Sequence, residues 1–217
     1  ASADLYHSFG RLQANLLVEG FYTMLNNVFT LVRIGENEDG SIVYWERRNG
    51  SGATVAGVNF EGKIGIPHRF ELQLGYTLQS SRYDTPERWS DQLAPQRKMF
   101  RAPDHYGYLT SLFDITPRFK ASLFGTYTGS MLVKHILSDG TNETDLEQNT
   151  PSFWDMGIKL AYTFRIGKAV NLEVNTGVKN IFDAYQKDLD YGAFKDADYV
   201  YGPSLPRMYF VGIKFSI

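Results

Sequence analysis

The sequence contains no cysteine, which excludes a disulfide-stabilised scaffold and a zinc site built on thiolates. It also lacks an excess of basic residues, because 22 Lys and Arg stand against 24 Asp and Glu, for a net charge of −2. A nucleic-acid-binding protein carries a clear positive excess, so we expect no nucleic-acid partner. No stretch reaches the roughly 18 consecutive apolar residues that a membrane-spanning helix needs.

Aromatic residues and glycine are abundant. The 217 residues include 14 Tyr, 15 Phe and 20 Gly, a composition that favours strands and tight turns over helices. Aromatics make up 15% of the chain and its net charge is small, which excludes an intrinsically disordered protein. The length fits one domain, or part of one.

Apolar and polar residues alternate strictly along several segments. In residues 170–179 one parity is apolar and the other polar: Val170, Leu172, Val174, Thr176 and Val178 against Asn171, Glu173, Asn175, Gly177 and Lys179. The same period of two runs through residues 70–79, 154–164 and 209–217. Because the apolar period of a helix is 3.6, the alternation predicts an all-β chain.

About nine strands are predicted in total. They cover residues 4–9, 12–29, 56–64, 70–79, 105–115, 119–127, 154–164, 170–179 and 209–217. Residues 105–115 are ambiguous, because apolar side chains occur on both of their parities. Tight turns are expected at residues 10–11, 66–69, 116–118 and 166–168, and longer polar segments at residues 35–41, 84–104, 137–151 and 182–206.

Short and long connections therefore alternate along the chain, as they do in an up-and-down barrel of the outer-membrane type. A Greek-key sandwich would place its long crossings irregularly, although a soluble antiparallel sheet shows the same apolar–polar alternation. Several predicted strands extend over about ten to fifteen residues, whereas soluble strands average about five or six. Aromatic residues also gather at strand ends, as in interfacial girdles: Tyr106, Tyr108, Tyr127, Phe153, Trp154, Tyr162, Phe164, Tyr209 and Phe210. The pattern favours the membrane barrel.

The C-terminal residues carry a more specific pattern. Asn180-Ile181-Phe182-Asp183-Ala184-Tyr185, then Gly202-Pro203, Pro206-Arg207 and a last strand through Gly212 to Phe215, resembles the closing segment of TonB-dependent outer-membrane receptors. Upstream, Gly20-Phe21-Tyr22, Gly57-Val58-Asn59-Phe60-Glu61 and Arg101-Ala102-Pro103 look like segments of the same family's barrel. The last residue of that family is usually aromatic, whereas this chain ends at Ile217.

The resemblance implies a barrel of about 22 strands with a plugged lumen. About nine strands cannot close such a barrel, so residues 1–217 are expected to be the C-terminal β-barrel segment of a longer receptor. We expect the N-terminal plug domain and the segment that contacts TonB to lie outside this chain. An odd strand count supports this expectation, because complete bacterial barrels have even counts.

What the resemblance implies about function is TonB-energised uptake of a scarce ligand across the outer membrane: an iron–siderophore, haem, cobalamin or a glycan. The expected partners are outer-membrane lipid and lipopolysaccharide, the plug domain, TonB and the small-molecule ligand. The polar parity is expected to line the lumen: Glu61, Glu71, Gln73, Asn171, Glu173, Asn175 and Lys179. Candidate ligand contacts in the extracellular loops are Tyr83, Trp89, Arg97, Arg101, His105 and His135.

Metal and cofactor sites are weakly indicated. Phe100-Arg101-Ala102-Pro103 spells a box associated with haem receptors, but the Asn-Pro element that follows it in that group is missing, so no cofactor is predicted. Asp188, Asp190, Asp196 and Asp198 crowd the last long segment, yet their spacing does not match a twelve-residue calcium loop. We predict a solvated acidic loop there, and no metal site.

No catalytic motif is present: there is no Gly-x-Ser-x-Gly, phosphate-binding loop or His-Glu-x-x-His. We therefore expect no enzymatic activity. Two alternatives to the receptor stay open, a complete small barrel acting as a passive porin or adhesin, and, more remotely, a barrel hydrolase.

Overall fold

The computed structural model describes residues 1–36, 38, 43–167 and 170–216. The interpretations that concern Lys168 and the terminal Ile217 lie outside these residues. The described chain forms strands alone, and no helix in it could span a membrane. The strands are β1 (Ser2–Phe9), β2 (Leu12–Leu25), β3 (Phe29–Glu36), β4 (Val43–Asn49), β5 (Ala53–Ile66), β6 (Phe70–Glu87), β7 (Gln96–Lys98), β8 (His105–Thr116), β9 (Phe119–Thr128), β10 (Leu132–Ser138), β11 (Glu143–Asn149), β12 (Phe153–Ile166), β13 (Val170–Lys179) and β14 (Met208–Ser216).

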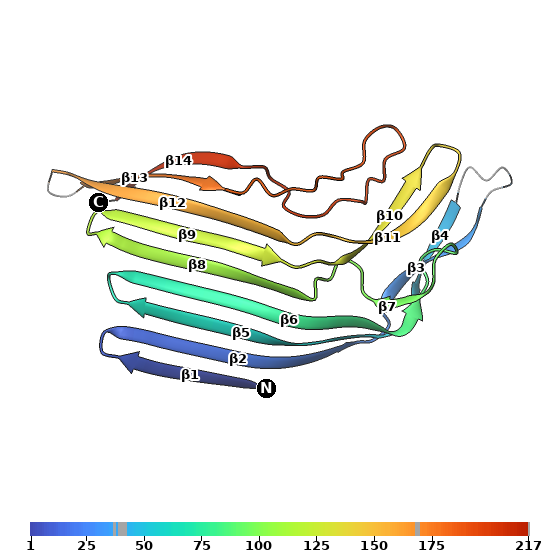
Figure 1. The fold of residues 1–217 in the computed structure, drawn as a ribbon, viewed down its shortest axis with the longest axis horizontal. Helices are drawn as coiled ribbons and strands as arrows, with labels where there is room; N and C mark the ends of the chain where they lie inside the picture. Colours follow the sequence, from blue (N-terminus) through green and yellow to red (C-terminus); the bar gives the residue numbers. More distant parts are fainter. Residues whose placement is uncertain (37, 39–42, 168–169, 217) are drawn as a thin grey trace.

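Nine of these strands form one antiparallel sheet in the order β1-β2-β5-β6-β8-β9-β12-β13-β14 (Figure 1), with the short β7 added to β6. Each of the nine pairs with the next one along the path, so the predicted all-β, up-and-down architecture of about nine strands is confirmed. The strands are long as well: β2, β5 and β12 have 14 residues and β6 has 18.

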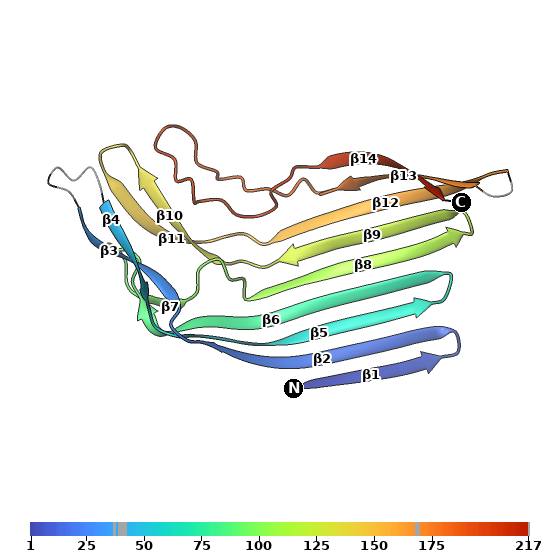
Figure 2. The same ribbon diagram turned by 180° about the vertical axis from the view of Figure 1, so that it is seen from behind.

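The two ends of the sheet differ. All the tight turns lie at one end and all the long connections at the other (Figure 2). Two of the long connections contain hairpins of their own, β3–β4 and β10–β11, which the sequence patterns did not predict. β11 shows why it was not predicted. Its sequence, Glu-Thr-Asp-Leu-Glu-Gln-Asn, has no alternation of apolar and polar residues, and the strand is recognised only from its pairing with β10.

The strand register places the predicted polar residues on one face. Gly75 pairs with Glu61, Lys63 with Gln73, and Gly65 with Glu71, so one parity continues from strand to strand. The same continuity links Glu173 and Asn175 in β13 to neighbours of matching parity in β12 and β14. All seven residues expected to line a lumen, Glu61, Glu71, Gln73, Asn171, Glu173, Asn175 and Lys179, therefore share one face, the polar face of the sheet.

Cross-strand polar contacts run along this polar face. Lys63 Nζ lies 2.9 Å from Glu71 Oε1, and Gln73 Nε2 donates to Tyr108 Oη at 3.0 Å. Thr77 Oγ1 donates to Asn59 Oδ1 at 2.8 Å. The opposite face presents exposed apolar side chains, from Leu74 on β6 to Ile213 on β14. A polar face with internal hydrogen bonds and an exposed apolar face is the reverse of a soluble sheet packed on a core.

The register also resolves the ambiguous residues 105–115. His105 pairs with Leu78, and Gly107 pairs with Tyr76, so both lie on the apolar face, whereas Tyr106 and Tyr108 lie on the polar face. Phe153 and Phe210 lie on the polar face too, opposite Thr128 and Gly177. The expectation that these four aromatic residues join an outer girdle is therefore wrong. The other girdle residues lie on the apolar face, where the rings of Tyr127 and Trp154, on adjacent strands, have centroids 4.6 Å apart.

Aromatic rings on the polar face lie over glycines of the neighbouring strand. The directly paired residues are Phe21 with Gly57, Tyr108 with Gly75, Phe124 with Gly157, and Phe210 with Gly177. A Cβ added to Gly57 would lie 2.7 Å from Phe21 Cζ, and one added to Gly177 would lie 2.6 Å from Phe210 Cζ. Glycine is required at these positions because the ring occupies the space of a side chain.

Gly57→Ala should lower the free energy of unfolding by about 1–3 kcal/mol, the usual cost of overpacking. The new methyl would overlap the Leu78 carbonyl oxygen as well as the Phe21 ring, and backbone cannot move aside as a side-chain tip can. Gly62→Ala on the same strand is the matched control, since its Cβ would have nothing within 4 Å and should change stability by less than about 0.5 kcal/mol. Denaturant unfolding from lipid vesicles measures both variants, and equal effects would contradict the role assigned to the ring.

The buried hydrophobic cluster lies among the long connections, at the end of the sheet. Val133, Phe153, Tyr199 and Tyr201 form it, with Met131 and Ala184 packed against it. These residues come from β10, the start of β12 and the connection between β13 and β14. The long connections are thus held together by packing of their own.

Candidate functional site

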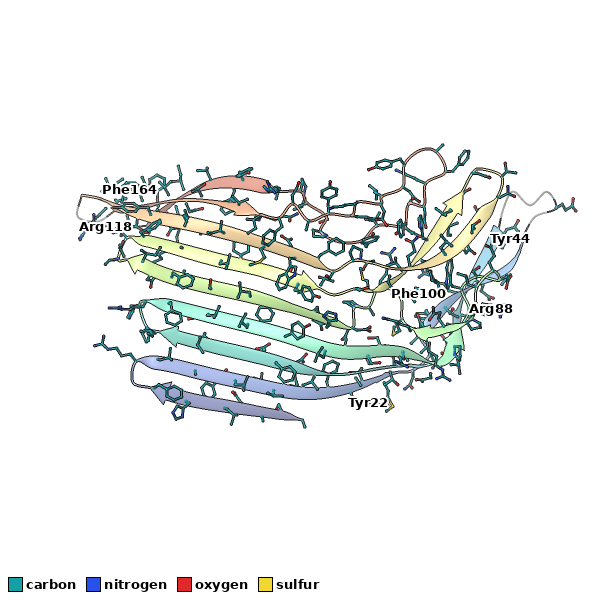
Figure 3. All side chains as sticks on the ribbon, viewed as in Figure 1. Tyr22, Tyr44, Arg88, Phe100, Arg118 and Phe164 are labelled. Carbon is teal, nitrogen blue, oxygen red and sulfur yellow. The ribbon has the colours of Figure 1, made fainter. Side chains whose placement is uncertain are left out.

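One cavity of about 990 Å³ lies at the long-connection end, and all four long connections contribute to its walls. Val28 and Phe29 come from the first connection, Trp89 and Phe100 from the second, and Lys134 from the third. The fourth contributes Asp196, Ala197, Asp198 and Val200. Figure 3 shows Arg88 and Phe100 at this end of the molecule, whereas Arg118 and Phe164 lie at the tight-turn end. Segments far apart in sequence therefore converge on a single cavity.

Lys134 is held between two aromatic rings in this cavity. Its Nζ lies 5.0 Å from the Trp89 ring centroid and 4.9 Å from that of Phe100, within the range of cation–π contacts. Burial lowers the pKa of Lys134; the nearby Glu147 carboxylate opposes this shift, and the Arg101 charge adds to it. The Trp89 ring is fixed in turn, because its Nε1–H donates to Glu147 Oε1 at 2.9 Å.

Arg101 lines the cavity, but its guanidinium joins loops to one another. Nη1 donates to the Val200 carbonyl at 2.8 Å, and Nη2 donates to the Asp198 carbonyl. The Arg101 amide donates to the Leu132 carbonyl at 2.8 Å, and its backbone adopts a positive φ of 58°. Arg101 therefore ties the second, third and fourth long connections together.

His135 lies outside the cavity, although Lys134 and Ile136 on either side of it line the wall, because successive strand residues point to opposite sides. Its ring stacks on Tyr199 with centroids 3.6 Å apart, and its Nε2 lies 2.9 Å from Asp190 Oδ2. His135 is 5% exposed and packs within the loop cluster.

His105 and Arg97 also lie away from the cavity. His105 Nδ1 is 2.8 Å from Tyr76 Oη, in the aromatic row on the apolar face. Arg97 on β7 donates from Nη1 to the Asp84 carbonyl at 2.7 Å. Of the six predicted ligand contacts, the structure thus brings Tyr83, Trp89 and Arg101 to one cavity and places Arg97, His105 and His135 elsewhere.

Three of the four acidic residues of the last connection accept hydrogen bonds within the loop cluster, while Asp188 and Asp198 remain exposed to solvent. Asp190 accepts the Asp196 amide at 3.2 Å, and Asp196 accepts the Ile136 amide at 2.8 Å. Asp188 accepts the hydroxyls of both Tyr199 and Tyr201. No group of three or more metal-ligating side chains that could hold an ion is found within the described residues.

The hydrogen bonds between Asp188 and the hydroxyls of Tyr199 and Tyr201 shift the pKa values of these groups. Burial by itself would raise the pKa of Asp188, but hydrogen bonds from Tyr201 and Tyr199 outweigh it and hold that pKa below the ordinary value. Burial and the hydrogen bond to Asp188 together raise the pKa of Tyr201 to about 12. Both tyrosines therefore stay protonated and keep donating to Asp188 throughout the neutral range.

The closing motif at residues 180–185 is a structural junction. Asn180 is 2% exposed, and its Nδ2 donates to the Ala184 and Leu205 carbonyls, both at 2.9 Å. Its Oδ1 accepts the Ala184 amide at 2.8 Å, and Asp183 Oδ1 accepts the Arg207 amide at 2.9 Å. The motif follows β13 directly, and the hydrogen bond between Asp183 and Arg207 joins the two ends of the long connection at its base.

Sequence reasoning missed Lys134 and Arg88, and it treated Phe100 only as part of a haem-type box. Lys134 carries no signal of its own, because its position depends on the unpredicted β10–β11 hairpin. Arg88 directly precedes Trp89 and follows the long β6, so its place at the strand end was the available clue.

No protein-family model matches the sequence, and no curated protein matches it either. Solved structures do. The ferric-catecholate import receptor Fiu from E. coli K12 matches 94% of this chain with 22% identity and a TM-score of 0.57. The siderophore receptor PirA from Acinetobacter baumannii matches 98% with 15% identity and a TM-score of 0.57. The fold is that of a TonB-dependent receptor barrel.

The outer membrane transporter YddB from Escherichia coli extends the comparison, with 12% identity over 99% of this chain and a TM-score of 0.57. This chain spans 25% of Fiu, 30% of PirA and 31% of YddB. The similarity of fold therefore extends over about a quarter to a third of the length of these chains.

Proposed function

We propose that this chain is the C-terminal barrel part of an outer-membrane receptor that takes up a scarce ligand with energy delivered through TonB. The observation that carries the proposal is the convergence of all four long connections on one cavity. Long connections of outer-membrane barrels face the outside of the cell, so the cavity would meet an incoming ligand first. The structural neighbours, which include an import receptor, a siderophore receptor and a transporter, support the same proposal.

The two faces of the sheet fit this role. The exposed apolar face, with its aromatic row from Tyr76 to Trp154, suits contact with lipid and lipopolysaccharide. The polar face, with Glu61, Glu71, Gln73 and Glu173, would line a wet lumen and contact a plug domain. In this proposal the chain binds and guides a ligand and catalyses no reaction.

The test is growth of a strain that lacks the gene for this chain. Iron complexes, haem, cobalamin, copper and glycans would be supplied one at a time as the limiting nutrient. We expect growth to fail on one source, to return with the wild-type gene, and to fail equally when TonB is removed. Uptake that continues without TonB would contradict the proposal and indicate a passive barrel.

A further inference from the structure

The tight turns at one end of the sheet are basic. Arg11, Arg69 and Arg118 each lie in one of the tight turns that the structure describes in full, and all three residues are exposed. None of these turns contains Asp or Glu. Residues 137–151, at the opposite end of the sheet, hold four carboxylates and neither Lys nor Arg. Positive charge therefore gathers at the tight-turn end.

The carboxylates beside two of these arginines already have cation partners. Asp114 Oδ1 lies 3.1 Å from Lys120 Nζ, and Glu71 is bound by a lysine of β5 at 2.9 Å. A cavity of about 530 Å³ opens beside Arg69, and the carboxylates that line it are these same two. Within the described residues, Arg69 and Arg118 form hydrogen bonds through their backbone groups, and their guanidinium groups form no ion pair. Both guanidinium groups are available to an anion.

An exposed apolar surface adjoins the same two arginines. Phe70 directly follows Arg69 and pairs with Phe113 of β8, and the two rings have centroids 6.4 Å apart. Phe113 is 43% exposed and Ile115 is 57% exposed. The Arg69 carbonyl accepts an amide of β8 at 2.8 Å, so its turn lies directly beside the end of the strand that leads to Arg118. Two cations thus border one apolar surface.

The order of rings and arginines along the strands fits the edge of a bilayer. Aromatic rings gather at a membrane interface, and the charged heads of arginines lie just beyond it, at the level of the lipid phosphates. In each of these turns an arginine lies within two residues of a phenylalanine on the apolar face, about 7 Å along a strand at most. The pairs are Phe9 with Arg11, Arg69 with Phe70, and Arg118 with Phe119.

We propose that Arg69 and Arg118 bind the headgroup of an anionic phospholipid. Its acyl chains lie over Phe70, Phe113 and Ile115. A guanidinium matches a phosphate because it can form two parallel hydrogen bonds with it. A zwitterionic lipid carries an amine that cancels its phosphate charge, so two cations favour a headgroup of net negative charge, such as phosphatidylglycerol. The site lies at the opposite end of the sheet from the cavity among the long connections.

The test places a fluorescent label beside the proposed site in the complete receptor. This chain contains no cysteine, so Ile115→Cys introduces one thiol into it for a bimane label. Vesicles then contain brominated phosphatidylglycerol or brominated phosphatidylcholine at equal mole fractions, and quenching reports which lipid lies next to the label. We expect phosphatidylglycerol to bind about threefold more tightly or better. A label at Leu78→Cys, 48% exposed on the apolar face towards the long connections, should show no such preference.

Variants assign the preference to the two arginines. Arg69→Gln combined with Arg118→Gln should bring the preference at the Ile115 label down to the level at the Leu78 label. Lys187→Gln combined with Lys195→Gln is the matched control, because it removes the same charge from exposed residues of the last connection. The control should leave the preference unchanged. An equal loss in both double variants would mean that overall charge, and not this site, attracts the lipid, and would contradict the assignment.

Other occupants are distinguished in the same assay. A large excess of inorganic phosphate should leave the preference unchanged, and its loss would mean that the arginines bind the free anion. Equal quenching by the two lipids would overturn the proposal and leave the arginines to an acidic protein. The receptor function fails separately, through uptake that continues without TonB. Absence of quenching by either lipid would refute both, because the apolar face would then not lie in a membrane.

Discussion

Val174→Lys should lower the free energy of unfolding by about 2–4 kcal/mol, the cost of an ammonium on the lipid face of a barrel near the bilayer midplane. Val174 lies in the middle of β13, between Tyr162 of β12 and Ile213 of β14 on the apolar face. Lipid offers the ammonium neither water nor an acidic partner. The measurement is denaturant unfolding of the complete protein from lipid vesicles.

The neighbouring residue gives the control for this prediction. Asn175 lies on the polar face between Ala161 and Gly212, where charged side chains such as Lys159 and Glu173 already occur. Asn175→Lys should therefore change stability much less. Equal tolerance of the two variants would mean that no lipid face exists, and a larger loss in Asn175→Lys would reverse the assignment of inside and outside.

Asn180→Ala is the second large effect, and we expect it to lower the free energy of unfolding by about 2–4 kcal/mol. The substitution removes three hydrogen bonds at once and leaves the carbonyls of Ala184 and Leu205 without the Asn180 donor and the Ala184 amide without its acceptor. Asn180 also has a φ of 48°, which Asn tolerates better than Ala does. Limited proteolysis between β13 and β14 should speed up in parallel.

Asn27→Ala separates the two contributions. Asn27 has a similar φ of 55° but an exposed side chain, for which the described residues show no hydrogen bond. Asn27→Ala should therefore lower the free energy of unfolding only by the cost of an alanine at positive φ, within about 1 kcal/mol. If Asn27→Ala were as costly as Asn180→Ala, the hydrogen bonds of the closing motif would contribute little.

Much of the fold could be predicted from the sequence because apolar and polar side chains alternate along each strand, and this alternation gives the sequence a period of two. In residues 170–179 every odd position is polar or glycine, so the face of each side chain follows directly. Residues 105–115 could not be assigned in this way. Tyr106 and Tyr108 lie on the polar face, where the parity rule expects polar residues, and Tyr108 covers Gly75 of the neighbouring strand.

The candidate site was predictable only in part. Trp89 and Arg101 were predicted as ligand contacts because they are an aromatic and a cationic residue of a long loop. The structure places both at one cavity, where Arg101 donates to backbone carbonyls. His105 was misplaced because its strand parity was ambiguous, and Lys134 was missed because its position is set by contacts between connections. Periodicity describes a strand, but it says nothing about how four long loops pack on one another.

The glycine–aromatic pairs have a consequence for how the strands find their partners. Alternation forbids a slip of one residue, since that would turn every side chain to the wrong face, but a slip of two residues leaves both faces intact. Such a slip would move the Phe21 ring from Gly57 onto Val55 or Asn59, and the Tyr108 ring from Gly75 onto Gln73 or Thr77. Each ring would then face a side chain and lose the space that the glycine leaves for it. The rings therefore distinguish the native alignment from alignments that the polar and apolar pattern would accept equally well.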